Sequence, residues 1–385
     1  MAGPALSLER VYLDHAASSP LLPEVAEAMA SVQFLPGNPS SLHTAGRRRR
    51  ALLEEARESI AADLGASPVE VVFTSGGTEG DNIAVLGSQL ARAGGDPVRD
   101  VVVVSAIEHP AVLGVARRLG ESVRVAPALA SGVVDLDSLG ALLDETVAVA
   151  SVMWVNNETG VVQPVGGVVE RARAVGAWAH SDAVQAVGHL PVDFGASGLD
   201  LLSLSGHKLG GPVGVGALLV RRGVTPRSVG VGGAQERELR PGTVPVTLAV
   251  GLAEAVRVAV GRLDAEASRL AGLRARLVAG LAEVPMASGN GDGEVSPAIV
   301  SVCFAGCRAS DLLLLLDQAG IDSSTGSACS AGVAQPSDVL LAMGRTPAEA
   351  SGSLRFSMGP QTTESDIDRL LAALPDAVAR ARAAY

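Results

Sequence analysis

Between residues 69 and 220 the sequence alternates short apolar segments with segments of helical character. Three helices are expected between these strands. One follows a glycine turn at 76–77, and the other two begin near residues 110 and 165. The expected strands cover 69–74, 101–104, 147–155, 177–180, 199–204 and 217–220. Continuously apolar strands separated by helices are typical of a parallel sheet that is covered on both faces. The pattern therefore predicts an α/β fold.

Polar sequences stand where these apolar segments end. Right-handed crossovers bring the C-terminal ends of parallel strands to one edge of a sheet, where ligands bind. We therefore expect the loop ends to converge on one cleft, although each alone is explained equally well as an ordinary loop. The glycine turn also suits a phosphate, but a plain tight turn accounts for it too. The loop ends are Ser75-Gly76, Glu108-His109, Asn156-Asn157-Glu158, Asp182 with Gln185, and Ser205-Gly206-His207-Lys208.

Lys208 is the only lysine among 30 lysine and arginine residues. An arginine supplies charge, but only an amine loses its proton readily enough to attack a carbonyl and form an imine. Pyridoxal 5'-phosphate (PLP) is the commonest cofactor that requires such a lysine. An arginine-rich composition leaves few lysines by chance, yet chance would rarely leave the survivor at a strand end beside Ser205 and His207. The sequence therefore predicts a Schiff-base lysine.

Length and composition exclude several classes of protein. With 385 residues, 48% of them hydrophobic, the chain can bury a large core and should form one large and one smaller domain. A formal charge of −11 argues against a general nucleic-acid binder. No apolar run approaches the roughly 18 residues that span a bilayer, and residues 1–10 lack the apolar stretch of a signal peptide. We expect a cytoplasmic protein.

The three cysteines do not form a disulfide framework. Cys303 belongs to an alternating apolar segment and is expected to be buried. Together with Cys307 it makes a poor metal motif, because no histidine is near, and we predict no metal site. Cys329 lies among small residues without helix or strand periodicity, a setting that gives a nucleophilic thiol the exposure and mobility it needs.

The C-terminal part of the chain predicts a compact α+β domain that is joined to the rest by one long helix over 247–283. We expect the large domain to cover 16–260 and the small domain to combine 1–15 with 261–385. The expected elements after the long helix are a strand at 299–304, a helix at 309–319, the loop 323–334, a helix at 336–343, a strand at 353–357 and a helix at 363–383.

Taken together, these motifs resemble those of the cysteine desulfurases, PLP enzymes of fold type I in the class V aminotransferase superfamily, and specifically the group with the longer cysteine loop. The resemblance covers nearly the whole chain. It implies a large domain with a mostly parallel seven-stranded sheet, a smaller α+β domain, and a homodimer. The motifs are Tyr12-Leu13-Asp14, Gly37-Asn38-Pro39-Ser40, Thr74-Ser75-Gly76 with Thr78-Glu79, Glu108-His109, Asn156-Asn157-Glu158, Asp182-Ala183, Gln185, Ser205-Gly206-His207-Lys208, Gly242-Thr243, Gly326-Ser327-Ala328-Cys329 and Arg355-Phe356.

The resemblance implies a role for each matching residue around the cofactor. Lys208 would bind PLP covalently and then take the substrate α-proton. Asp182 would pair with the protonated pyridine nitrogen, and His109 would stack on the ring and handle protons. Gln185 and Asn157 would lie near the phenolic oxygen of the ring.

The resemblance also implies the phosphate and substrate ligands. The phosphate would be held by Gly77, Thr78, Ser205, His207 and, from a second subunit, Thr243. The substrate carboxylate would be clamped by Arg355, whose planar fork suits two parallel hydrogen bonds, with help from Asn38 and Asn157.

The reaction implied by the resemblance converts L-cysteine to L-alanine. Cys329 attacks the substrate sulfur, becomes a persulfide and passes the sulfur to an acceptor thiol. The chain departs from the family pattern at His15, at Pro241 before Gly242, and in ending at Tyr385 without the extension that docks an iron–sulfur scaffold protein. The acceptor therefore stays open between iron–sulfur cluster assembly, tRNA or DNA thiolation and other thio-cofactor pathways.

Other functions share part of this pattern. A selenocysteine lyase, or another PLP enzyme such as an epimerase or aminotransferase, would keep Lys208 and Asp182 but would not need Cys329. A sulfur-carrier protein that binds partners without turnover would need neither the lysine nor Arg355.

Overall fold

The computed structural model describes residues 10–326 and 335–384. Its centre is a seven-stranded sheet in the order β2-β8-β7-β6-β5-β3-β4. Strand β8 pairs antiparallel with β2 and β7, and the remaining pairs are parallel, so the mostly parallel α/β sheet predicted from the sequence is confirmed. The strands are β2 (Val71–Thr74), β3 (Val101–Ser105), β4 (Val123–Ala126), β5 (Val147–Ser151), β6 (Trp178–Asp182), β7 (Leu201–Ser205) and β8 (Gly216–Val220).

Alternate residues of each strand point to opposite sides of the sheet, and residues on both sides are buried. Val71, Phe73 and Val103 belong to the main core, whereas Val72 and Val102 belong to smaller cores on the other face. The helices around this sheet are α1 (Pro23–Gln33), α2 (Thr44–Asp63), α3 (Gly77–Asn82), α4 (Ser88–Gly95), α5 (Pro110–Leu119), α6 (Leu136–Ala141), α7 (Val165–Ala174), α8 (Phe194–Ser197) and α9 (Val246–Gly261).

A second, smaller core lies beside the first. Its antiparallel sheet has the order β12-β10-β9, and the N-terminal strand β1 (Val11–Tyr12) pairs with β11 (Ile321–Asp322). Leu13 therefore packs with C-terminal residues such as Phe304 and Phe356. The other elements are β9 (Ala287–Gly289), β10 (Ile299–Phe304), β12 (Ser353–Ser357), α10 (Leu263–Ala282), α11 (Ala309–Gln318), α12 (Asp338–Ala342), α13 (Pro347–Ser351) and α14 (Glu364–Ala383).

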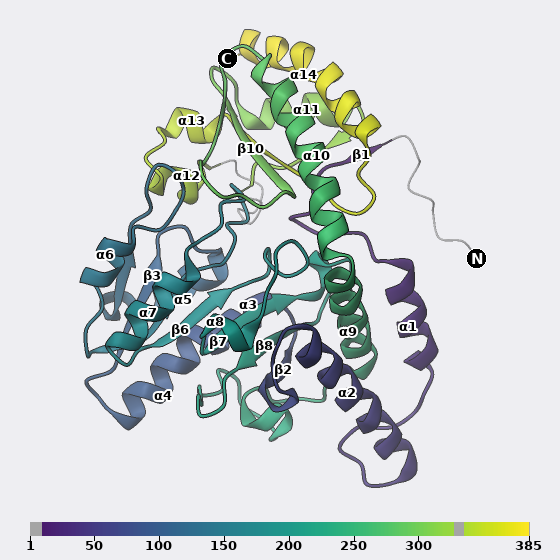
Figure 1. Cartoon of the computed structure of the whole chain (residues 1–385), viewed down its shortest axis with the longest axis vertical. Coiled ribbons are helices and arrows are strands. Elements are labelled where there is room, and N and C mark those ends of the chain that lie inside the picture. Colours follow the sequence, from purple (N-terminus) through teal and green to yellow (C-terminus); the bar gives the residue numbers. More distant parts are fainter. Residues whose placement is uncertain (1–9, 327–334, 385) are drawn as a thin grey trace.

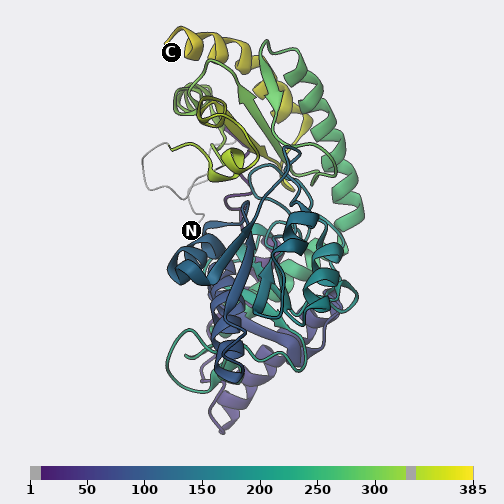
Figure 2. The same ribbon diagram turned by 90° about the vertical axis from the view of Figure 1, so that its left-hand side faces the viewer.

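The molecule is elongated, and α10 runs along the small part from its junction with α9 (Figures 1 and 2). The single helix predicted over 247–283 is wrong. Arg262, with φ −106° and ψ 1°, separates α9 from α10. The short strand β4 was not predicted, because Arg124 interrupts its apolar residues and only Ala126 is buried.

Two further observations concern the classes of protein that the sequence excluded. Within 10–326 and 335–384 no helix is both long and apolar enough to cross a membrane. Cys303 and Cys307 are buried free thiols, as expected for Cys303. Cys329 lies outside the described residues.

Candidate active site

A cavity of about 330 Å³ lies where the loops after five sheet strands meet. This convergence was predicted from the polar strand ends. The segment 16–17, Gly326 and Arg355 close the cavity from the side of the small core. The side chains and turns that line it after β2, β3, β5, β6 and β7 include Gly77, Thr78, His109, Asn157, Asp182, Gln185, Ser205, His207 and Lys208.

Lys208 ends a single 3-10 turn, residues Gly206–Lys208, that follows β7 directly. A side chain at Gly206 would place its Cβ 2.9 Å from the carbonyl oxygen of Pro212, so only glycine allows this close turn. The Lys208 Nζ donates hydrogen bonds to the carbonyl oxygens of Ala16 and Ala17, each at 2.7 Å. These bonds hold the amine at the wall of the cavity.

Asp182 is the last residue of β6 and is buried beside His109. Its Oδ1 accepts a hydrogen bond of 2.9 Å from the backbone N–H of Val184. Burial raises the pKa of Asp182, and the nearby His109 and Lys208 oppose that rise. A cation bound in the cavity beside Asp182 would add to the effect of His109 and Lys208 and favour the ionised carboxylate.

His109 caps the N-terminus of α5. Its Nδ1 accepts a hydrogen bond of 3.1 Å from the backbone N–H of Ala111, so in the neutral ring the proton is on Nε2. Burial is the main cause that lowers the pKa of His109, and Lys208 lowers it further, while Asp182 acts in the opposite direction. The ring is therefore held mainly as the neutral tautomer.

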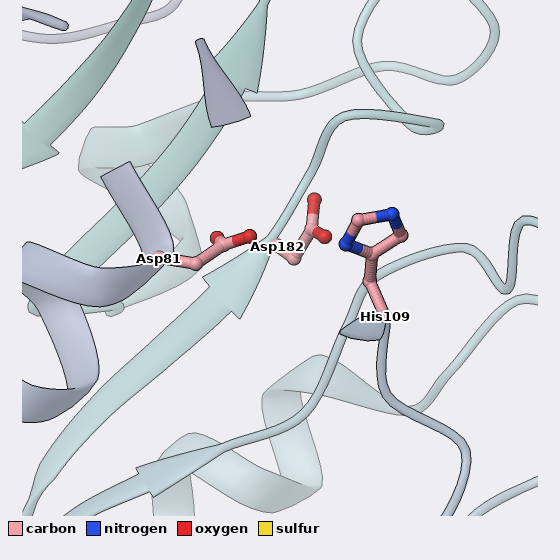
Figure 3. A group of neighbouring side chains, drawn as sticks. All are labelled: Asp81, His109 and Asp182. Carbon is pink, nitrogen blue, oxygen red and sulfur yellow. The ribbon is translucent and has the colours of Figure 1, made fainter. Parts of the chain in front are cut away.

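Asp81 is a third member of this group that sequence reasoning did not assign. One ligand atom each from Asp81, His109 and Asp182 lies within 4.8 Å of the others, and Asp182 is between the other two (Figure 3). The available signal was a carboxylate separated by Asn82 alone from the apolar run Ile83-Ala84-Val85. Such a trio has the composition of a metal site, and the same oxygens suit a protonated heterocyclic nitrogen.

The glycine turn after β2 provides space and donors for an anion. A Cβ on Gly77 would lie 2.7 Å from a methyl group of Val184, so any larger residue would push into the cavity wall. Ser205 is buried beside this turn. Burial, aided by Lys208, lowers the pKa of His207 to about 4, so His207 offers neutral hydrogen-bonding groups at neutral pH.

Arg355 comes from β12 and is 2% exposed. Its Nη1 donates to the carbonyl oxygen of Asn157 at 2.8 Å, and its Nη2 donates to Asp14 Oδ1 at 2.7 Å. Its Nε is buried without a hydrogen-bond partner among the described residues. Gln185 lies nearby and donates to the carbonyl oxygen of Ala16 at 2.9 Å.

Some of the predicted residues do not line this cavity. Asn38, assigned to the site by resemblance, is absent from its described walls, and so is Thr243, which was predicted to reach the site of a second subunit rather than that of its own chain. Cys329 falls outside the described residues. His15, whose role was open, is buried, and its Nδ1 lies 3.3 Å from the Ser19 hydroxyl rather than in the cavity wall.

Comparison with known proteins identifies the family. The model of the Aminotransferase class-V family matches residues 11–370. An IscS-like cysteine desulfurase of Mycobacterium tuberculosis is 51% identical to this chain over 97% of both proteins. The chain belongs to the cysteine desulfurases of the class-V aminotransferase family. The resemblance found in the sequence is thereby confirmed.

Solved structures agree with this family assignment. A NifS-like protein covers 96% of this chain and 100% of its own length, with 35% identity and a TM-score of 0.89. A structure described as SspA in complex with cysteine covers 91% of this chain and 99% of its own, with 31% identity and a TM-score of 0.79. The fold of this desulfurase is therefore PLP fold type I, as predicted.

PLP is the cofactor of this family, and the residues present fit it. The Asp182 carboxyl is buried at the cavity, where a protonated pyridine nitrogen would be its cationic partner. Lys208 presents an amine at the cavity wall. Gly77 and Thr78 line the cavity at the start of α3, where their backbone N–H groups would face a phosphate.

Proposed function

We propose that this desulfurase converts L-cysteine to L-alanine and stores the removed sulfur as a persulfide on Cys329. The observation that carries the proposal is that Lys208, Asp182 and Arg355 border one cavity, although they come from distant parts of the chain. The solved relative described as SspA in complex with cysteine supports cysteine as the substrate.

Arg355 is proposed to bind the substrate carboxylate. It is a buried cation whose Nε has no described hydrogen-bond partner, and a carboxylate would satisfy this donor. Two other nitrogens of the guanidinium are held by Asn157 and Asp14, so the fork is already fixed before substrate enters. A fixed fork loses little conformational entropy on binding.

Lys208 is proposed to move the α-proton of the substrate. When bound, PLP supplies an electron sink for the negative charge that is left at the α-carbon. Asp182 would hold the pyridine nitrogen in its protonated form, and the Lys208 amine would take the α-proton of the substrate and return it at the end of the reaction. His109 is proposed to give its Nε2 proton during product release, because its Nδ1 is occupied by the Ala111 N–H.

The sulfur transfer balances without an external oxidant. The Cys329 thiolate attacks the substrate sulfur, an S–S bond forms and the bond between Cβ and sulfur breaks, with its electron pair remaining on the carbon. The carbon is reduced and then protonated to the methyl group of alanine, while the Cys329 sulfur is oxidised to the persulfide level. A thiol of the acceptor then removes the outer sulfur.

The test is alanine production from L-cysteine by the PLP-loaded protein, with and without a reducing thiol. We expect Cys329→Ala to lose alanine and sulfide production while it retains bound PLP, and Cys303→Ala, which changes a buried thiol, to stay active. Alanine production by Cys329→Ala at the wild-type rate would instead favour a lyase that needs no enzyme thiol, of the kind that acts on selenocysteine.

We further propose that the active unit is a homodimer in which Thr243 completes the site of the partner subunit. Thr243 does not line the cavity of its own chain, and its neighbour Val244 borders a different cavity of about 470 Å³ together with Pro39, the neighbour of Asn38. These two loops are therefore available to a second copy.

Mixing two inactive variants tests the shared site. Lys208→Ala and Thr243→Ala inactivate different parts of a site. If Thr243 acts across the interface, a mixed dimer contains one intact site, in which Lys208 of the Thr243→Ala subunit meets Thr243 of the Lys208→Ala subunit. We expect activity to reappear on mixing after subunit exchange. If Thr243 acts within its own chain, no mixed dimer contains an intact site and activity stays absent.

The sulfur acceptor is proposed to be a protein thiol of an iron–sulfur cluster assembly, a tRNA or DNA thiolation, or another thio-cofactor pathway. Loading Cys329 with radioactive sulfur and adding candidate acceptor proteins in turn would identify it by transfer of the label.

A further inference from the structure

Asp81 is buried on α3, and within the described part of the chain no lysine or arginine is recorded as its ion-pair partner. The residue is 1% exposed, and its Oδ1 has no hydrogen-bond partner among the described residues. His180 Nε2 lies 3.6 Å from that oxygen, which is beyond hydrogen-bond length. An ionised carboxylate in this position would therefore be an uncompensated buried charge.

His180 does not supply the missing charge. It is fully buried, and its Nδ1 and Nε2 lie 2.9 and 3.0 Å from the hydroxyls of Ser151 and Ser203. Burial lowers the pKa of His180 to about 3, so the ring is neutral at physiological pH. The Ser203 hydroxyl also hydrogen-bonds the Asp81 carboxyl and is neutral as well.

The other ionisable groups around Asp81 increase its tendency to hold a proton. Burial is the main cause that raises the pKa of Asp81, and the carboxyls of Asp182 and Glu108 raise it further. Asp182 differs because it accepts the Val184 N–H and is acted on by His109 and Lys208, which favour its ionised form. Of the two carboxyls, Asp182 is thus the one that ionises more readily, and Asp81 is the one that retains its proton.

We propose that Asp81 is a positioning residue that stays protonated and acts through Asp182, its neutral carboxyl turning a donor toward the Asp182 carboxylate. Figure 3 shows the Asp81 carboxyl pointing from α3 toward Asp182 on β6, and the Asp182 carboxyl lies between Asp81 and His109. The pair then presents a single negative charge to the cofactor, and that charge resides on Asp182.

This inference rests on the proposed function, because it assigns Asp81 to the PLP site. Its consequence is that PLP binding depends on a hydrogen-bond donor at position 81 and not on a negative charge there. Asparagine has nearly the shape of aspartic acid, is neutral and keeps donors, so Asp81→Asn reproduces the protonated form. Leucine has a similar size but no donor, so Asp81→Leu removes it.

Cofactor binding to the apoprotein, followed by absorbance, compares these variants. We expect the PLP Kd of Asp81→Asn to stay within about threefold of wild type, with an unchanged pH dependence of the absorbance, and that of Asp81→Leu to rise by roughly tenfold or more. Equal shifts in both variants would overturn the proposal, since charge would then be the cause. A wild-type Kd for Asp81→Leu would overturn it too.

Infrared spectroscopy of the apoprotein decides the protonation state even if Asp81→Leu fails to fold. We expect wild type at neutral pH to show the carbonyl stretch of a protonated carboxyl that disappears in Asp81→Asn. Glu108 is another buried carboxyl with a raised pKa, so Glu108→Gln removes its band and separates it from the band of Asp81. If Asp81→Asn retains every carboxyl band of the wild type, Asp81 is ionised and the proposal is overturned. Failure of wild type to bind PLP would contradict the proposed function instead.

Discussion

Arg355 Nη2 lies 2.7 Å from Asp14 Oδ1, so an ion pair connects β12 to the segment that follows the N-terminal strand. The guanidinium is almost entirely buried, with 3% of its side chain exposed, while 22% of the Asp14 side chain is exposed. The pair therefore fixes the arginine at the cavity and leaves its Nε for a ligand.

Arg355→Lys should weaken substrate binding more than it slows turnover. A lysine keeps the charge but cannot hold Asp14, Asn157 and a carboxylate with one planar fork. We expect the KM for L-cysteine to rise by roughly tenfold or more, with a smaller fall in kcat. Arg276→Lys, which alters an exposed pair with Asp368, is the control and should leave both constants unchanged. An unaltered KM in Arg355→Lys would assign carboxylate binding to another group.

Lys208→Arg should abolish covalent attachment of PLP without unfolding the protein. Since Lys208 is the only lysine, borohydride treatment of the loaded wild type should fix a pyridoxyl group on one peptide, identified by mass spectrometry. The double variant Lys208→Arg with Arg276→Lys restores a lysine at an exposed position and should remain unlabelled. Label at position 276 would mean that attachment does not depend on the site.

Glu108→Gln should remove part of the pH dependence of folding stability in the apoprotein. Burial raises the pKa of Glu108 to about 8 from 4.5, so the folded state retains a proton that the unfolded state loses between these values. Wild-type stability should therefore fall as pH rises from 4.5 to 8, by at most about 5 kcal/mol from this group.

Glutamine keeps the acceptor that binds the Met153 N–H and carries no proton to lose. Urea unfolding at pH 5 and pH 8 should thus show a smaller difference for Glu108→Gln than for wild type. Parallel pH profiles of the two proteins would mean that Glu108 has an ordinary pKa.

Glu236→Gln should destabilise the loop that leads to Thr243. Glu236, Arg237 and Glu238 all have positive φ values, of 45°, 57° and 64°, which are unfavourable for residues other than glycine. The buried Glu236 carboxylate holds this segment through Arg57 at 2.7 and 2.9 Å and through the Phe73 N–H at 2.8 Å. Breaking a buried ion pair of this kind costs about 3 kcal/mol of unfolding free energy.

Urea unfolding of Glu236→Gln measures this cost. Glu254→Gln, which breaks the exposed pair with Arg257, is the matched control and should change stability little. If both variants unfold at the wild-type urea concentration, the strained segment is held by other contacts.

The sequence was most informative about short segments whose residue types follow from a single physical requirement, such as burial of a strand. Apolar strands separated by helices predicted the sheet, because burial of both faces requires them. The polar strand ends predicted the cavity around Lys208, because chain topology determines which strand ends share an edge of the sheet. The break at Arg262 was missed because the apolar periodicity continues from α9 into α10 and no proline or glycine pair interrupts it there.

By itself the sequence determined the α/β sheet, the need for an amine at Lys208 and, through the order of its motifs, the cysteine desulfurase family. Only the tertiary structure decided which charges face each other. Asp81 meets Asp182, and Asp14 meets Arg355, across about 100 and 341 residues of sequence respectively. Such pairs leave no periodic signal, because their partners come together only when separate elements pack, and burial then decides which group keeps its proton.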